Sequence, residues 1–225
     1  MVAYMININA LRDLRSLDYL RPWDAPIDFR VQGVLEYFLN LSGDKILVIG
    51  SWDGLHDCQL AQAGAVVTSS DIRPQNLQRA LYRALYHRLH TITYRLLDME
   101  EMAKEIKVDE FDIIFHSGCF YHLPNPVKHL REIAKLAEYL LLETHIADAR
   151  YQSGELEGYK GCWYQEGIWE APLAAKEQVS SFWLEESELE RLFKDCHLGI
   201  VKVIARPLAN PAGPRNCYLL RRNVL

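Results

Sequence analysis

The residues best suited to chemistry begin with a glycine-containing loop. The continuous apolar run from Ile46 to Ile49 predicts a strand buried on both faces, and the loop Gly-Ser-Trp-Asp-Gly follows it at residues 50–54. Glycines allow the backbone to turn sharply and approach a ligand, and the helix expected after the loop offers free N–H groups. Trp52 interrupts the glycine pattern of pyrophosphate binders, so the loop favours a ligand without a pyrophosphate.

Two carboxylates follow the next two predicted strands. Asp71 ends the strand at residues 66–70, about 20 residues beyond the first loop glycine, where an acid can accept hydrogen bonds from ribose hydroxyls. Asp98 follows the strand at residues 91–96 and could accept from an adenine amine. Because the carboxyl ends of parallel strands meet at one edge of a sheet, the loop and both acids predict a nucleoside site.

Histidines near the same edge are candidate general bases. His122 lies in residues 119–124, just past the predicted strand at residues 112–116, and an unperturbed imidazole titrates near neutrality. His145 follows the strand at residues 139–143 and is the weaker candidate. A structural role for His122, hydrogen-bonded to backbone, stays open.

The elements that position these residues alternate strands with amphipathic helices, which is typical of a parallel α/β sheet. Helices are expected at residues 29–39, from Pro74, from Asn125-Pro126 and from a capping box at residues 187–190. The last two strands, at residues 200–205 and 217–220, are separated by too few residues for a crossover helix and should form an antiparallel hairpin. The sequence predicts an α/β fold with a Rossmann-like, seven-stranded, mostly parallel sheet and a C-terminal antiparallel hairpin.

The whole chain, residues 1–225, is interpreted as one domain with a helical N-terminal segment, 1–28, and an aromatic lid insert, 146–182. Aromatic residues among glycines in the insert could close over an acceptor. The residues expected near the acceptor in and around this lid are Tyr121, Tyr159, Trp163 and Tyr164.

Arg215 and Asn216 open the last predicted strand. An arginine there could hold a carboxylate with two parallel hydrogen bonds. The alternative, a solvent-exposed hairpin residue, stays open.

Composition limits the partners. The net charge of -5 disfavours nucleic acid, without excluding it, because phosphate-binding surfaces are basic. Five scattered cysteines with no Cys-x-x-Cys pair indicate reduced thiols, no metal site and a cytoplasmic protein. No apolar run reaches the roughly 18–20 residues of a spanning helix, so no membrane partner is expected. The oligomeric state is not predicted.

The stretches ILVIGSWDGLHDCQLAQAGA, SSDIRPQNLQRA, LLDME, FDIIFHSGCFYHLPNPVKHLREIAKL and LLLETH together resemble the class I S-adenosylmethionine-dependent methyltransferases. The similarity is strongest to a bacterial group with a Gly-x-Trp-Asp-Gly loop and a Tyr-His-Leu after the fourth strand. That group includes small-molecule enzymes and the transfer-RNA wobble-uridine carboxymethyltransferase.

The resemblance implies S-adenosyl-L-methionine as cofactor and assigns roles to the strand ends. The methionine end of the cofactor would lie on the loop, and its ribose would lie on Asp71 and Ile72. The adenine would lie between Asp98 and Met99, and the sulfonium would lie near Ser117 and Gly118. The loop residues implied are Gly50, Ser51, Trp52, Asp53 and Gly54.

Two positions depart from the family pattern. Val48 replaces the acid usual two residues before the first loop glycine, and Trp52 replaces the middle glycine of the loop. Asp53 could partly replace the lost acid. Three functions stay open: methylation of an oxygen or nitrogen of a small molecule, modification of transfer RNA, and a non-catalytic subunit with the methyltransferase fold.

Overall fold

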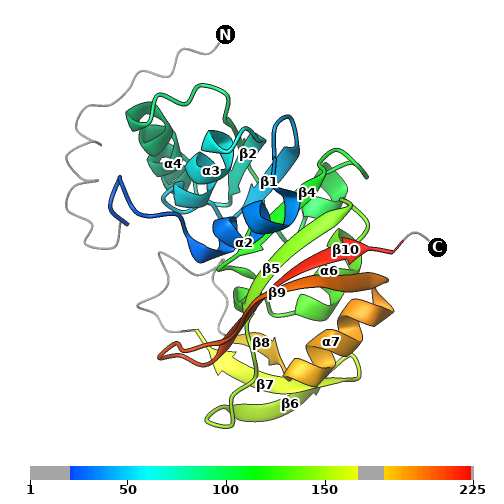
Figure 1. Ribbon diagram of the computed structural model, residues 1–225. Helices are drawn as coiled ribbons and strands as arrows, with labels where there is room; N and C mark the ends of the chain where they lie inside the picture. The colour runs from blue at the N-terminus through cyan, green and yellow to red at the C-terminus, as the bar shows by residue number, and fades with distance from the viewer. Residues whose placement is uncertain (1–20, 167–179, 224–225) are drawn as a thin grey trace.

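A computed structural model of the chain describes residues 21–166 and 180–223. Its main body is a seven-stranded sheet with the spatial order β3-β2-β1-β4-β5-β10-β9 (Figure 1). The strands are β1 Lys45–Ile49, β2 Val66–Asp71, β3 Thr93–Leu96, β4 Ile113–Ser117, β5 Tyr139–His145, β9 Leu198–Leu208 and β10 Arg215–Arg222.

The first five strands are parallel, and the last two are antiparallel. β10 runs against β5, with Arg215 opposite His145, and β9 runs against β10. The predicted mostly parallel sheet with a C-terminal antiparallel hairpin is therefore confirmed.

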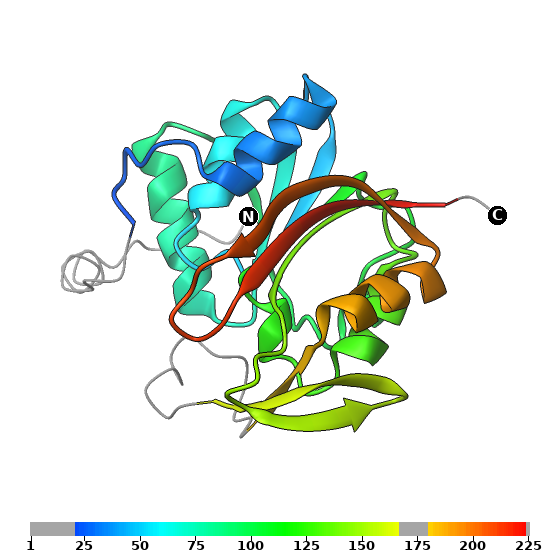
Figure 2. The ribbon, with the colours of Figure 1, turned by 60° about the horizontal axis from the view of Figure 1, so that its bottom comes forward.

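Helices cover both faces of the sheet (Figure 2). Alternate side chains of each strand point to opposite faces, so Ile46 and Val48 of β1 join one core while Leu47 and Ile49 join the other. The first core includes residues of α2 Phe29–Phe38, α3 Leu55–Gln62 and α4 Pro74–Tyr86. The second includes residues of α5 Met102–Glu105, α6 Pro126–Ile133 and α7 Glu186–Asp195.

The helix N-termini follow the sequence signals in most places. Asn125 caps α6 by accepting a hydrogen bond from the Lys128 N–H, and Pro126 is the first helical residue. The predicted capping box at Ser187 is wrong. The N-cap of α7 is Glu185, two residues before Ser187, and it makes no side-chain capping bond, so the helix begins at Glu186.

The predicted lid insert contains regular structure. Its described part forms an antiparallel sheet of β6 Gln152–Leu156, β7 Tyr159–Gln165 and β8 Ser180–Leu184. The Phe182 N–H donates to the Leu123 carbonyl, which attaches β8 to the 3-10 turn η1 Phe120–His122. In these residues the predicted aromatic lid is therefore built on strands.

The rest of the insert, residues 167–179, and residues 1–20 of the expected N-terminal helical segment lie outside the described residues. Residues 21–28 of that segment are described and are not helical. In the described part of the chain no helix is both long and apolar enough to cross a membrane.

Candidate functional site

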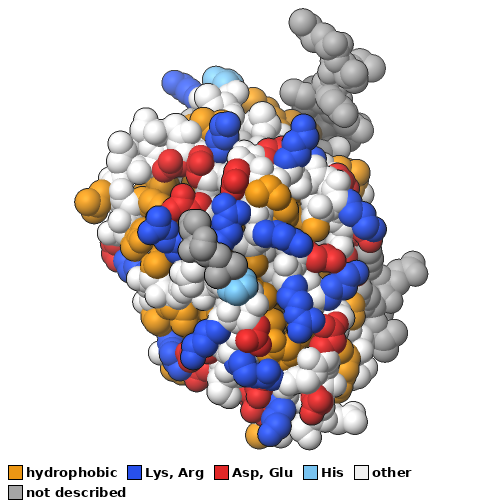
Figure 3. All heavy atoms as spheres, turned by 90° about the vertical axis from the view of Figure 1, so that its right-hand side faces the viewer, with side chains coloured by type: hydrophobic (Ala, Val, Ile, Leu, Met, Phe, Trp, Pro, Cys, Tyr) orange, Lys and Arg blue, Asp and Glu red, His pale blue; other side chains and the backbone are white. Residues whose placement is uncertain are grey.

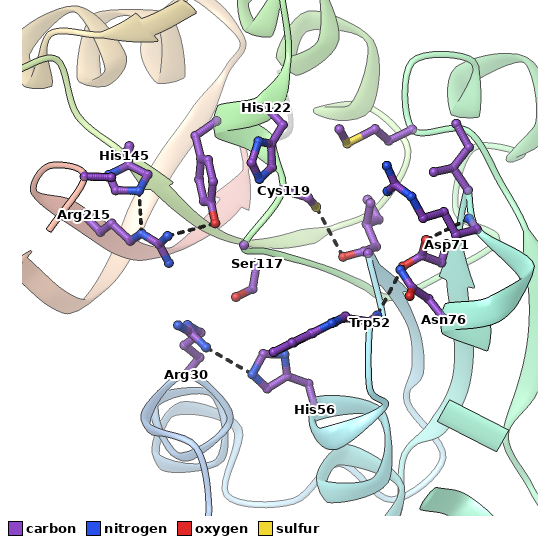
Figure 4. Close-up of a pocket in the computed structure, with 18 of the residues that line it drawn as sticks. Arg30, Trp52, His56, Asp71, Asn76, Ser117, Cys119, His122, His145 and Arg215 are labelled. Carbon is purple, nitrogen blue, oxygen red and sulfur yellow. Dashed lines mark hydrogen bonds between the residues drawn. The ribbon is translucent and has the colours of Figure 1, made fainter. Parts of the chain in front are cut away.

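A cavity of about 680 Å³ lies at the carboxyl ends of the parallel strands (Figure 4). Its volume falls in the usual range for small-molecule sites, roughly 300–1,000 Å³. It brings together many of the predicted site residues: Gly50, Trp52, Asp71, Ile72, Asp98, Met99, Ser117, Gly118, Tyr121, His122, His145, Tyr164 and Arg215.

The glycine loop has a backbone that turns through left-handed conformations. Gly50 and Gly54 have φ values of 70° and 75°, and Trp52 has a φ of 49°, which is uncommon for a bulky residue. A Cβ at Gly54 would lie 2.5 Å from the Ala80 Cα, so this glycine allows α3 to begin against α4. Gly50 and Trp52 line the cavity, whereas Gly54 does not.

Asp71 connects the end of β2 to the loop. Its carboxylate accepts hydrogen bonds from the Trp52 N–H at 3.2 Å, the Arg73 N–H at 2.9 Å and the Asn76 side-chain amide at 3.1 Å. The carboxylate is thus oriented from three sides at the cavity wall, as a residue that binds ligand hydroxyls would need to be.

Asp53 does not face the cavity. Its side chain is 1% exposed and pairs with the guanidinium groups of Arg21 and Arg83. Burial alone would raise its pKa, but the hydrogen bonds and charges of these two arginines lower it. Contrary to expectation, the Asp53 carboxylate does not line the cavity, because it is directed to Arg21 and to Arg83 of α4.

Ser51 is also turned away from the cavity. Its hydroxyl donates to a carboxylate oxygen of Asp57 at 2.9 Å and accepts from the Ser69 hydroxyl at 2.8 Å. Burial raises the pKa of Asp57 to about 6. Ser51 and Gly54 therefore shape the loop from beneath, without lining the cavity.

The remaining strand ends present a glycine, a methionine and a carboxylate. Gly118, with a φ of 78°, has open space where a Cβ would stand, and Met99 lines the cavity beside Asp98. The Asp98 carboxylate accepts from the Glu100 N–H at 3.0 Å. These residues follow β3 and β4, as predicted.

His122 lies between two groups of cavity residues, with Arg215 and His145 on one side and Asp71 and Trp52 on the other (Figure 4). Its Nδ1 is 3.0 Å from the Glu166 carboxylate, to which the Ser181 hydroxyl also donates at 2.8 Å. A donating Nδ1–H leaves Nε2 with a lone pair, which is the form that accepts a proton. Glu166 and Ser181 were not predicted.

His145 is held differently. Arg215 Nε donates to its Nε2 at 2.9 Å, and its ring stacks on Trp183 with centroids 4.3 Å apart. Burial, reinforced by the Arg215 charge, lowers the pKa of His145 to about 3. Because the guanidinium occupies the Nε2 lone pair, this geometry does not favour His145 as a base.

Three predicted acceptor residues lie outside the cavity lining. Tyr159 is buried and donates its hydroxyl to Asp195 at 2.5 Å, and Trp163 packs on Phe182 in the main core. Along β7 successive side chains alternate, so Tyr164 reaches the cavity and Trp163 faces away. Asn216 is 1% exposed and donates to Tyr218. These predictions are wrong as to placement.

The cavity has walls that sequence reasoning missed. Trp183 of β8 donates its indole N–H to the Tyr121 carbonyl at 2.8 Å, and Arg30 of α2 contacts both Asp28 and His56. Neither Trp183 nor Arg30 follows a strand of the main sheet, so no local signal marked these two residues. Missed lining residues include Arg21, Asp28, Arg30, His56, Arg73, Asn76, Cys119, Trp183, Asn210, Pro211 and Ala212.

Comparison with known proteins supports the resemblance. Residues 47–138 match the family model described as a methyltransferase domain. The chain is 29% identical over 162 residues, 70% of its length, to the tRNA U34 carboxymethyltransferase of Colwellia psychrerythraea, and covers 48% of that protein. It is 29% identical over 118 residues, 52% of its length, to the ubiquinone biosynthesis O-methyltransferase of Bordetella avium, again covering 48% of it. The chain thus spans about half the length of these curated relatives.

Solved structures share the fold over nearly the whole chain. The N-terminal domain of EvdMO1 with S-adenosylhomocysteine bound has a TM-score of 0.73 at 18% identity, with 99% of each chain covered. Magnesium protoporphyrin IX methyltransferase from Synechocystis PCC 6803, with S-adenosylmethionine bound, has a TM-score of 0.61 at 16% identity, with 96% of this chain and 91% of that chain covered.

Proposed function

We propose, from the membership of this chain in the class I S-adenosylmethionine-dependent methyltransferases, that it transfers a methyl group from S-adenosylmethionine to an oxygen or nitrogen of a small molecule. The observation that carries this proposal is one continuous cavity with two kinds of wall. One part has the carboxylates and glycines of the strand ends. The other part has aromatic rings, histidines and arginines.

The first part fits the cofactor. Asp71 and Asp98 offer carboxylate acceptors at neighbouring strand ends, where hydroxyls and an amine of a nucleoside would bind. Gly118 leaves space that any side chain would fill. Asp71, Asp98, Met99 and the backbone at Gly50 and Gly118 would hold the cofactor, which supplies an electrophilic methyl group on a sulfonium when bound.

The chain's own contribution is alignment and proton removal. In-line attack needs the acceptor atom held in position, which the rigid strand ends and aromatic walls supply. An acceptor hydroxyl must lose its proton as it reacts, and His122 Nε2 is the group oriented to take it, with Nδ1 fixed by Glu166. Glu166 acts as a positioning residue, through His122.

Calorimetry with S-adenosylhomocysteine tests the cofactor site. Asp71→Ala should weaken binding by about 1–3 kcal/mol, roughly 5- to 150-fold, because ligand hydroxyls lose a charged acceptor. Glu155→Ala, at an exposed position of β6, is the matched control and should leave the affinity unchanged. No binding to the wild-type chain at millimolar ligand, or equal affinity in Asp71→Ala and wild type, would contradict the proposal.

Transfer RNA is the alternative acceptor, suggested by one curated relative. It would need a contiguous basic surface. On the face shown in Figure 3, basic side chains are interspersed with acidic ones. A gel shift with bulk transfer RNA at moderate salt would reveal such a partner, and a stable complex would favour this alternative over a small molecule.

A further inference from the structure

The part of the cavity away from Asp71 is here called the acceptor half and comprises Arg30, Tyr121, His145, Trp183 and Arg215. Its two arginines come from distant elements, α2 and β10, and both approach Glu143 of β5. The distances to the Glu143 carboxylate are 3.8 Å from Arg30 and 3.3 Å from Arg215. Glu143 has no exposed surface, whereas the side chains of Arg30 and Arg215 are 16% and 19% exposed. The exposed charge contributed by these three residues is therefore positive.

The guanidinium of Arg30 also forms an ion pair with a second carboxylate, that of Asp28, at 3.2 Å. Arg215 pairs with no carboxylate except Glu143 within residues 21–166 and 180–223. Two other neighbours of Arg215, His145 and Tyr121, carry no charge that could offset that of the guanidinium. Burial lowers the pKa of His145 to about 3 and raises that of Tyr121 well above its usual range. Around Arg215, the one carboxylate among the described residues is the fully buried Glu143, and the neighbours nearer the cavity, His145 and Tyr121, are neutral.

The guanidinium of Arg215 is fixed in orientation. It donates to His145 at 2.9 Å through Nε, to Tyr121 at 2.9 Å and to Glu143 at 3.3 Å, and it lies over the Tyr121 ring at 4.6 Å. A guanidinium has five N–H donors, and these contacts use three. An oriented guanidinium with donors to spare suits a carboxylate ligand.

The neighbouring wall is a packed cluster of aromatic rings. The Trp183 ring stacks on His145, with centroids 4.3 Å apart and planes 6° apart, and on Tyr164, with values of 4.4 Å and 14°. Tyr121 meets His145 edge to face. These rings stack on one another, and Trp183, His145 and Tyr121 are at most 9% exposed, so they offer a ligand chiefly their edges, which suit contact with another aromatic ring.

We infer that the acceptor is an aromatic carboxylic acid, whose carboxylate binds Arg215 with support from Arg30 and whose ring packs on the wall formed by Trp183, His145 and Tyr121. This inference rests on the proposed function, since it names the molecule that shares the cavity with the cofactor. It adds the anionic group that the acceptor must carry.

Matched probe pairs test the charge. Benzoate and benzamide, and phenylacetate and phenylacetamide, differ in charge but hardly in shape. Titrated at millimolar concentration into protein saturated with S-adenosylhomocysteine, each acid should bind at least tenfold more tightly than its amide, because charge-assisted hydrogen bonds to arginine are lost in the amide.

Variants of Arg215 test whether this residue causes the preference for the acids over the amides. Arg215→Gln should abolish the acid preference, and Arg215→Lys should keep only part of it, because lysine lacks the planar fork. Arg206→Gln, a half-exposed arginine of β9 paired with Glu186, is the control and should keep the full preference. S-adenosylhomocysteine binding to each variant reports that the fold is intact.

The outcomes are separable. Equal binding of acid and amide, no measurable acid binding, or a preference that survives in Arg215→Gln would each overturn the inference while leaving the proposed function standing. Failure of the wild-type chain to bind S-adenosylhomocysteine would instead overturn the proposed function itself.

Discussion

Lowering the pH should unfold this protein through its buried histidines. His56, His116, His129 and His145 are all at most 9% exposed, and burial is the largest cause of a lowered pKa in each. In the unfolded chain a histidine has a pKa of about 6.5. Between that value and the folded pKa, the unfolded state binds more protons, so stability is full above about pH 6.5 and falls as the pH decreases. Asp57, whose folded pKa is raised to about 6, acts in the opposite direction.

The size of the effect follows from these groups. At about pH 5.5 each histidine of the unfolded chain is about nine-tenths protonated, and the proton held by folded Asp57 subtracts roughly 0.7. Counting His116, His129 and His145, whose pKa values are lowered most strongly, unfolding should therefore take up about two protons, each changing the unfolding free energy by about 1.4 kcal/mol per pH unit, and His56 acts in the same direction.

Urea unfolding followed by tryptophan fluorescence, repeated between about pH 7.5 and 5.5, measures this slope. His145→Gln should reduce the uptake by about one proton, because one neutral ring is removed. His90→Gln, at an exposed position, is the control. A stability that stays level across this range would refute the reasoning, since it would mean that the histidines are not held neutral by burial.

Further outcomes are expected from the glycine loop, α4 and the thiols. Arg83→Met should lower the unfolding free energy by about 3–5 kcal/mol, because Asp53 stays buried with less compensation; a loss below about 1 kcal/mol in urea unfolding would contradict this. Gly54→Ala should destabilise more than Gly43→Ala, since both have positive φ but only Gly54 would meet a backbone atom, 2.5 Å away; equal thermal stability would remove the packing argument. All five cysteines have raised pKa values, chiefly through burial. Iodoacetamide at about pH 8 should therefore label the native protein slowly and the urea-unfolded protein at all five cysteines. Rapid labelling of the native protein would contradict the burial of the thiols.

The sequence predicted the parts of the site that follow the main-sheet strands. Asp71 and Asp98 reach one cavity because parallel strands end at a common edge, and that geometry needs only the strand pattern. The same holds for His122, which follows β4. Short-range patterns were sufficient here.

The direction of individual side chains was harder to predict. Asp53 belongs to the loop, yet its side chain faces Arg83, which is 30 residues away in the sequence. No local sequence pattern predicts that pair. Tyr159 and Trp163 were expected near the acceptor because their segment, rich in glycine and aromatic residues, was interpreted as a lid over the acceptor. Its residues form a strand, and alternation along that strand directs Tyr164, not Trp163, to the cavity.

The separate three-stranded sheet has a consequence for how this protein could diversify. Tyr164 and Trp183 reach the cavity from β7 and β8, which pair with each other and not with the strands that carry Asp71 and Asp98. The wall is attached to the body by backbone bonds from Phe182 to Leu123 and from Ala147 to Leu184, and also by the Trp183 indole, which donates to the Tyr121 carbonyl. Directed evolution could therefore randomise Tyr164, and keep the buried Trp183, to change acceptor preference while the nucleoside-binding strand ends stay intact.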